Sequence, residues 1–270
     1  MALDDVARDG LVLLGCGKMG TALLTGWLAE GIPATSFWVI EPNPTDWLLS
    51  KGVHLNEPLP KSPAVALVAV KPQMMGAALP ALQALGNGPT LFISIAAGTS
   101  IATFEAALGA RTPIVRTMPN TPAMVGRGIT GICANTHAGA AGLATARELM
   151  EAVGQVVELD GEHQIDAVTA VSGSGPAYVF HLIETMAAAG VAIGLSENVA
   201  MQLARATVCG AGELAYRSPD SASKLRINVT SPAGTTAAAL NVLMDPATGF
   251  PPLLRKAVKA AADRGKELGQ

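Results

Sequence analysis

The chain has 270 residues, enough for one large domain or two ordinary domains with a substantial core. Only 14% of the residues are charged and 50% are hydrophobic, so we expect part of the surface to be covered in a homo-oligomer. The net charge of −3 provides no basic patch, which argues against nucleic acid as a partner.

Membrane and metal partners are not expected either. The longest uncharged stretch, 72–104, is interrupted by Pro and Gly, and the N-terminus lacks the pattern of a signal peptide, so we expect a cytoplasmic protein. Cys16, Cys133 and Cys209 are widely spaced, and the four His residues show no ligand spacing. We therefore expect neither a disulfide nor a metal site.

The first half of the chain alternates short, Val- and Ile-rich runs with helical segments. Predicted strands are 11–14, 37–40, 65–70, 91–95 and 114–116, and predicted helices are 21–29, 45–50, 74–85 and 101–108. A further strand pair, around 131–134 and 155–159, flanks a helix at 141–152. Apolar runs of this length are typical of strands buried on both faces of a parallel sheet. The alternation predicts an α/β, Rossmann-type doubly wound sheet over residues 1–160.

The second half, residues 161–270, contains no convincing strand and predicts an all-α domain. Helices are expected at 176–194, at 197–216 with Ser196 or Glu197 as its start, at 232–244 and at 251–268. The segment 176–194 is apolar almost all round. Such a helix is buried on every side, so we expect this domain to form a homodimer.

A glycine-rich turn, Gly15-Cys16-Gly17-Lys18-Met19-Gly20, follows the first predicted strand and precedes a helix. This context is the one that a dinucleotide fingerprint requires, although a plain strand-to-helix turn is the alternative. Glu41 ends the second strand, where the residue that contacts the ribose belongs. It suits an NAD ribose, but a solvated carboxylate at a strand end explains it equally well.

Two more segments lie where predicted strands end. Ala69-Val70-Lys71-Pro72 closes the third strand, and Met118-Pro119-Asn120-Thr121-Pro122 follows the fifth. Ligands of open α/β sheets bind at this edge, so Lys71 and Asn120 are candidate site residues. A surface lysine and ordinary turn chemistry are the alternatives.

Two polar turns open helices in the second half. In Ser172-Gly173-Ser174-Gly175-Pro176-Ala177-Tyr178 we expect Ser174 to be the N-cap, and in Ser231-Pro232-Ala233-Gly234-Thr235-Thr236 we expect Ser231 and Pro232 at N-cap and N1. Free N–H groups at helix N-termini bind anions. Both turns hold more Ser, Thr and Gly than a simple cap needs, which favours a small carboxylate substrate.

These motifs together resemble the pyrroline-5-carboxylate reductase family, which performs the last step of proline biosynthesis. The resemblance also covers Ser94–Gly98, Val229–Thr236 and Gly249-Phe250. It implies a Rossmann domain followed by a helical dimerisation domain, with dimers that assemble into larger rings. It also implies NADPH as the hydride donor, with NADH as the alternative that Glu41 favours, and an imine carboxylate as the small-molecule substrate.

The resemblance implies roles for particular residues. Cofactor phosphates would lie on Gly15, Cys16, Gly17, Lys18, Met19 and Gly20, the nicotinamide beside Ala69, Val70, Lys71 and Pro72, and Asn120 near the same cleft. Substrate would be bound by Ser172, Ser231, Gly234, Thr235 and Thr236, with the Thr236 hydroxyl as the catalytic group at the ring nitrogen.

The sequence departs from the family pattern at two places and leaves two other functions open. The family usually has Gly where Ala233 stands and Lys-Asp where Arg226-Ile227 stands, which affects substrate affinity or loop order. A β-hydroxyacid dehydrogenase is one competitor, but its Lys base is not found after Ser172 until Lys224. A catalytically silent nucleotide-binding regulator is the other, and the polar turns disfavour it.

Overall fold

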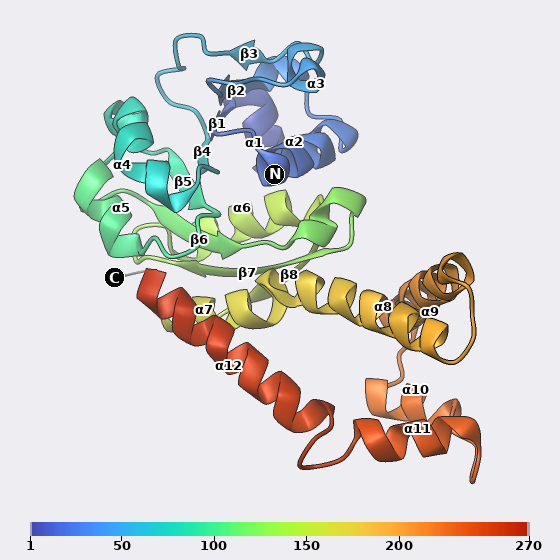
Figure 1. Ribbon diagram of the computed structural model, residues 1–270. Coiled ribbons are helices and arrows are strands. Elements are labelled where there is room, and N and C mark those ends of the chain that lie inside the picture. The colour runs from blue at the N-terminus through green and yellow to red at the C-terminus, as the bar shows by residue number, and fades with distance from the viewer. Residues whose placement is uncertain (1, 269–270) are drawn as a thin grey trace. The chain divides into compact units, whose positions relative to one another are not determined.

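The computed structural model describes residues 2–268 and divides into two compact units (Figure 1). The first unit comprises Met1–Gly173 and Ala262–Gln270, and the second comprises Ser174–Ala261. The sequence prediction places the domain boundary at residue 160. The first unit continues beyond that point because the short helix α7 (Ile165–Val168) and a π-helical turn, η6 (Thr169–Gly173), belong to it.

The first unit is built on an eight-stranded sheet in the order β3-β2-β1-β4-β5-β6-β7-β8. The strands are β1 (Leu11–Leu14), β2 (Phe37–Ile40), β3 (His54–Leu55), β4 (Val65–Val68), β5 (Leu91–Ser94), β6 (Ile114–Met118), β7 (Gly128–Ala134) and β8 (Gly154–Glu158). Neighbours pair in parallel except β6 and β7. The two are joined only by a short turn, η4 (Thr121–Val125), which cannot carry the crossover that parallel strands need.

Helices lie on both faces of this sheet (Figure 1). They are α1 (Ala2–Asp9), α2 (Lys18–Ala29), α3 (Asp46–Leu49), α4 (Met75–Ala78), α5 (Ile101–Leu108) and α6 (Gly139–Glu151), with 3-10 turns η1 (Ala34–Ser36), η2 (Pro72–Met74), η3 (Leu79–Leu85) and η5 (Glu162–Gln164). Because side chains alternate along a strand, Leu11 and Leu13 of β1 enter one core cluster, while Val12 and Leu14 enter the other. The doubly wound α/β fold is therefore confirmed.

Several predicted elements differ in detail from the observed ones. The predicted strands 65–70 and 91–95 end earlier, at Val68 and Ser94, and 114–116 extends to Met118. The predicted helix 74–85 is wrong as one element, because Pro80 near the start of η3 breaks it into α4 and η3. The helices α1 and α7 and the strand β3 were not predicted.

The second unit is helical, as expected. It contains α8 (Gly175–Ala192), α9 (Glu197–Arg217), α10 (Ala222–Asn228) and α11 (Thr235–Leu243), together with the first part of α12 (Phe250–Leu268). A small cluster of Ala187, Ala200 and Ala204 joins α8 to α9, and Gly194 makes the turn between them with φ +106°. Helix α9 begins at Glu197 with Ser196 as its N-cap, so the two residues that the sequence offered as its start take these two positions. The short helix α10 was not predicted.

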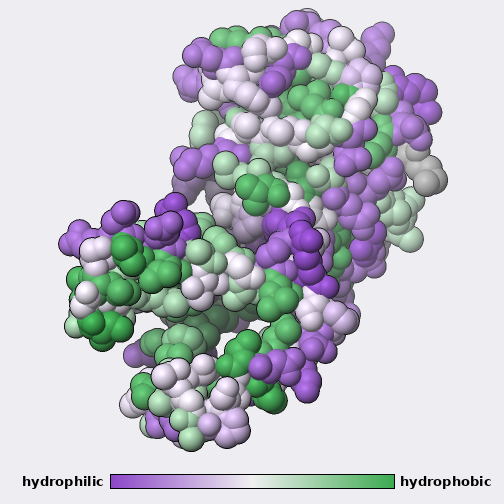
Figure 2. All heavy atoms as spheres, turned by 90° about the vertical axis from the view of Figure 1, so that its right-hand side faces the viewer, coloured by the Kyte–Doolittle hydropathy of each residue, from purple (hydrophilic) through white to green (hydrophobic). Residues whose placement is uncertain are grey.

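Much of the apolar surface of the second unit is uncovered in the single chain. None of the described residues of α10, α11 or α12 is buried. Hydrophobic side chains gather on the helices of this unit in Figure 2, and the exposed ones include Ile227, Val229, Val242 and Leu253. An apolar surface of this kind marks an interaction site. Among the described residues, no helix is long and apolar enough to cross a membrane.

Candidate active site

The glycine turn leaves β1 at the edge where β2 and β4 also end. Gly15 donates its N–H to Ile40 O of β2 at 2.9 Å, and Ala69 donates its N–H to Leu14 O at 2.8 Å. The turn is therefore fastened to both neighbouring strands at the point where the strand order reverses. Open α/β sheets bind their ligands at that point.

The three glycines of the turn have different surroundings, and a side chain at each would have a different effect. Gly15 has φ +90°, and a Cβ there would lie 2.9 Å from Val70 Cγ1 and 3.0 Å from Ala69 O. A Cβ on Gly20, in α2, would lie 2.7 Å from Gly15 O, so this residue allows helix and strand to pack closely. A Cβ on Gly17 would meet no protein atom within 4 Å. Gly17 therefore faces space that another molecule can occupy.

The residues of this turn fit a dinucleotide phosphate group. Gly17 is the N-cap of α2 and offers no side-chain cap, so the first N–H groups of the helix, which begins with Lys18 and Met19, keep their capacity for an acceptor. Lys18 is exposed and Met19 packs against the core. A side chain on Gly17 would extend into the space that a phosphate on this turn needs, and glycine leaves that space free.

Four further predicted residues follow β4 at the same edge. Ala69 and Val70 are half-buried and pack against the two core clusters. Lys71 is exposed and is the N-cap residue of η2, with Pro72 as its first residue. The structure therefore brings the Gly15–Gly20 and Ala69–Pro72 segments together, as the sequence predicts.

The Glu41 carboxylate is hydrogen-bonded to the glycine turn. Its Oε2 accepts the N–H of Cys16 at 2.9 Å, and its Oε1 accepts the N–H of Asn43 at 3.0 Å. Asn56 holds the Glu41 backbone from the other side, with two hydrogen bonds of 2.9 Å. Sequence reasoning missed Asn56, which lies fifteen residues away, and its φ of +54° is visible only in the structure.

Asn120 and Ser172 are brought together at the end of β6. Asn120 is buried, donates from Nδ2 to Ser172 O at 3.2 Å, and accepts the Ile129 N–H at Oδ1 at 2.9 Å. The Ser172 hydroxyl donates to Val168 O at 2.9 Å, which leaves its lone pairs to accept. Asn120 thus ties the loop after β6 to the π-helical turn that carries Ser172.

That π-helical turn was not foreseen from the sequence. A Cβ on Gly173 would lie 2.9 Å from Met118 Cε, so the glycine lets the turn approach the Met118–Asn120 segment. Ser174 takes the N-cap position of α8, as predicted, but it makes no side-chain cap because the π-turn already gives it helical φ and ψ. Turns of this type are frequent at functional sites.

The Ser231–Thr236 turn belongs to the second unit, and its predicted N-cap is wrong. Helix α11 begins at Thr235 with Gly234 as N-cap, and not at Ser231 and Pro232. Ala233 has φ +55°, which interrupts a helix, and Gly234 N–H closes a turn on Ser231 O at 3.1 Å. The N–H groups without intrahelical partners are therefore those that begin with Thr235.

The polar side chains of this turn lie near the start of α11. Ser231 and Thr235 are exposed, and Thr236 is half-buried as the second residue of α11. The positive end of the helix dipole lies at the same place. The observed helix start therefore places the N–H groups without intrahelical partners closer to Thr236 than the predicted start at Ser231 would.

Two of the three cysteines have buried thiols. Burial raises the pKa of the Cys16 thiol, and it raises the pKa of Cys133 to about 11, so both stay protonated at neutral pH. Among residues 2–268, no group of three or more His, Cys, Asp or Glu side chains could hold a metal ion.

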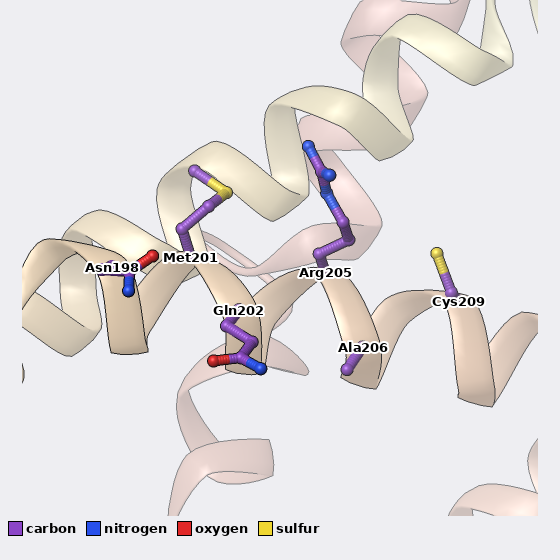
Figure 3. A pocket seen from close by; sticks show the side chains of 6 residues that line it. All are labelled: Asn198, Met201, Gln202, Arg205, Ala206 and Cys209. Atoms are coloured by element: carbon purple, nitrogen blue, oxygen red, sulfur yellow. The ribbon is translucent and has the colours of Figure 1, made fainter.

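A hollow of about 690 Å³ in the second unit is a different kind of surface. It is lined by residues three or four positions apart on α9: Asn198, Met201, Gln202, Arg205, Ala206 and Cys209 (Figure 3). This spacing is that of one helix face. A wall made by a single helix is suited to packing against another helix, and we do not assign the hollow to catalysis.

Comparisons with known proteins agree with this arrangement. A family model described as pyrroline-5-carboxylate reductase dimerisation matches residues 162–268, and one described as NADP oxidoreductase, coenzyme F420-dependent, matches residues 11–98. The chain is 40% identical over 266 residues to the pyrroline-5-carboxylate reductase of Pseudomonas aeruginosa, with 96% of this chain and 97% of that protein covered.

Two solved structures are similar over nearly the whole chain. The pyrroline-5-carboxylate reductase of Coxiella burnetii superposes with a TM-score of 0.89 at 34% identity and covers 97% of this chain and 99% of its own. The Plasmodium falciparum pyrroline carboxylate reductase, solved with NADP bound, has a TM-score of 0.82 at 30% identity, with the same coverage of both chains. From the family models and these full-length likenesses, the chain belongs to the pyrroline-5-carboxylate reductase family.

Proposed function

We propose that this chain is an NAD(P)H-dependent oxidoreductase that reduces the C=N bond of 1-pyrroline-5-carboxylate to give L-proline. The observation that carries the proposal is the open space at Gly17, on the edge where β1, β2 and β4 end, in a chain of this family. The full-length relatives favour this reaction over that of a β-hydroxyacid dehydrogenase.

The reaction requires little acid–base catalysis from the protein. The bound cofactor supplies a hydride from its nicotinamide C4 to the C=N carbon of the substrate. A protonated cyclic imine is already a good hydride acceptor, so positioning is the main contribution of the chain. Residues Gly15–Gly20 hold the phosphates through backbone N–H groups, and Ala69, Val70, Lys71 and Pro72 border the nicotinamide.

The substrate is held at the first turn of α11. The N–H groups of Thr235 and Thr236 point out of the helix start and bind the carboxylate, together with Ser231 and the N-cap Gly234. The Thr236 hydroxyl hydrogen-bonds the ring nitrogen. A side chain one position into the helix remains close to an anion bound at its end, which supports this role.

Asn120 and Ser172 lie together in the first unit. The Asn120 amide is already bonded to Ser172 O and to the Ile129 N–H, so its contribution to the cofactor side is to fix the loop after β6. Ser172 keeps acceptor capacity on its hydroxyl, which makes it a candidate for substrate binding.

The working form is a homodimer in the cytoplasm. The dimerisation model matches residues 162–268, and α10, α11 and α12 bury none of their described residues in the single chain. A second copy that packs on these helices covers the exposed apolar side chains. Assembly of the dimers into a larger ring is a further part of this proposal.

The purified chain tests the proposal directly. Mixed with 1-pyrroline-5-carboxylate and either NADH or NADPH, it should oxidise the cofactor and form L-proline in equal amounts. A silent nucleotide-binding regulator would bind the cofactor without this turnover. A chain that binds cofactor and leaves the imine unreduced would contradict the proposal.

A further inference from the structure

Glu41 is the first residue after β2 and is fixed in place by its neighbours. Its two carboxylate oxygens accept the N–H groups of Cys16 and Asn43 at 2.9 and 3.0 Å. Its own N–H donates to Asn56 Oδ1, and its C=O accepts from Asn56 Nδ2, both at 2.9 Å. The carboxylate is therefore held against the glycine turn and is not a solvated side chain that can swing away.

The carboxylate still has room for hydroxyl donors. An ionised carboxylate has about four lone-pair positions, and the two backbone N–H groups use one on each oxygen. When the pyrophosphate lies on the turn after β1, the adenosine ribose lies at the end of β2. Glu41 can then accept hydrogen bonds from ribose hydroxyls of NADH.

The sequence around Glu41 offers no cation for an additional phosphate, and His54 on the adjoining strand β3 is bonded to Glu57. Between Lys18 and Lys51 the sequence has no Lys, Arg or His, whereas it has a second acid, Asp46, five residues after Glu41. Lys51 Nζ lies over the Trp47 ring, 5.0 Å from its centroid. A 2′-phosphate, which carries up to two negative charges, would be placed beside an anchored carboxylate.

We propose that Glu41 makes this enzyme prefer NADH to NADPH, an inference that rests on the proposed use of the glycine turn for the cofactor. Repulsion of the 2′-phosphate by Glu41 and the loss of the hydroxyl donor act in the same direction. The expected result is that NADH binds about tenfold or more tightly than NADPH.

The test is the pair of dissociation constants, measured by titration of the protein without substrate. In Glu41→Gln the side chain keeps its size and one acceptor oxygen but loses its charge, so NADPH should bind more tightly and the preference should shrink severalfold. The matched control is Glu30→Gln, which removes the same charge at the exposed C-cap of α2, the opposite end of the helix from the turn. It should leave both constants unchanged.

The outcomes separate the inference from the proposed function. Equal affinities in the wild-type protein, or tighter binding of NADPH, would overturn the role of Glu41 while leaving the reductase intact. An unchanged ratio in a Glu41→Gln protein of wild-type melting temperature would do the same. If neither dinucleotide binds, both the inference and the proposed cofactor site fail. Glu41→Asp, which keeps the charge, should retain more of the NADH preference than Glu41→Gln.

Discussion

Thr236 is the residue on which the proposed chemistry depends most directly. A hydrogen bond to a charged iminium nitrogen contributes about 1.5–3 kcal/mol, so Thr236→Ala should lower kcat/KM by roughly 10- to 150-fold. Cofactor affinity and melting temperature should stay near wild type, since Thr236 is a half-buried residue of α11 in the second unit. Steady-state rates check this.

Thr25→Ala is a suitable control for that variant. Thr25 is an exposed helical threonine of α2 whose hydroxyl bonds to Thr21 O at 2.7 Å. Its replacement should leave kcat/KM unchanged. If Thr236→Ala also stays within about twofold of wild type, Thr236 is an ordinary first-turn threonine and its catalytic role is wrong.

Ala233 is a residue at which the backbone itself can be tested. Its φ of +55° is unfavourable for any residue with a Cβ, and more so for a β-branched one. Ala233→Gly should therefore raise the free energy of unfolding by about 0.5 kcal/mol, and Ala233→Val should lower it by about 1 kcal/mol or more. Denaturant unfolding of the wild-type, Ala233→Gly and Ala233→Val proteins measures these differences in the free energy of unfolding.

The same substitution in a regular helix should have the opposite sign. Ala238 is an exposed residue inside α11, and Ala238→Gly should lower the free energy of unfolding by about 1 kcal/mol. An Ala233→Val protein as stable as wild type would show that residue 233 does not adopt the left-handed conformation in solution.

At the scale of elements, we expect the turn between β1 and α2 to bind the cofactor. Gly17→Val should abolish NAD(P)H binding in a titration without lowering the melting temperature, because the new side chain enters open space and not the core. Gly76→Val is the matched control, since a Cβ on this glycine of α4 also meets nothing within 4 Å. Unchanged affinity in Gly17→Val would refute the phosphate assignment.

The elements also show how far sequence alone reaches. The strands 11–14 and 37–40 and the helix 101–108 were predicted with their observed bounds, because alternating apolar strands and helices leave strong local signals. The start of α11 was misplaced because Ser231-Pro232 resembles a cap, whereas the positive φ of Ala233 depends on the fold. The π-turn and the Asn56 contacts with Glu41 arise from tertiary packing and have no local signal.

At the scale of the whole molecule, the account requires a second copy of the chain. Light scattering at micromolar concentration should give at least twice the mass of one chain. Val242, which is 70% exposed on α11, is expected to be covered in the dimer. Val242→Asp should weaken the dimer by about 3–5 kcal/mol, the cost of leaving a buried charge without a partner.

An equivalent substitution outside α10, α11 and α12 distinguishes the loss of a dimer contact from a general effect of placing Asp at an exposed apolar position. Leu49 is 59% exposed on α3 of the first unit, and Leu49→Asp should leave the mass of the assembly unchanged. A wild-type monomer, or a Val242→Asp dimer as stable as the wild type, would contradict the proposed interface.

The central claim is hydride transfer from the nicotinamide to the imine carbon, and isotope transfer tests it most directly. NADH or NADPH that carries deuterium at the transferable C4 position is incubated with the protein and 1-pyrroline-5-carboxylate, and the product is analysed by mass spectrometry and NMR. The account predicts L-proline with one deuterium on its δ-carbon. No proline, or proline without deuterium from the labelled cofactor, would contradict it.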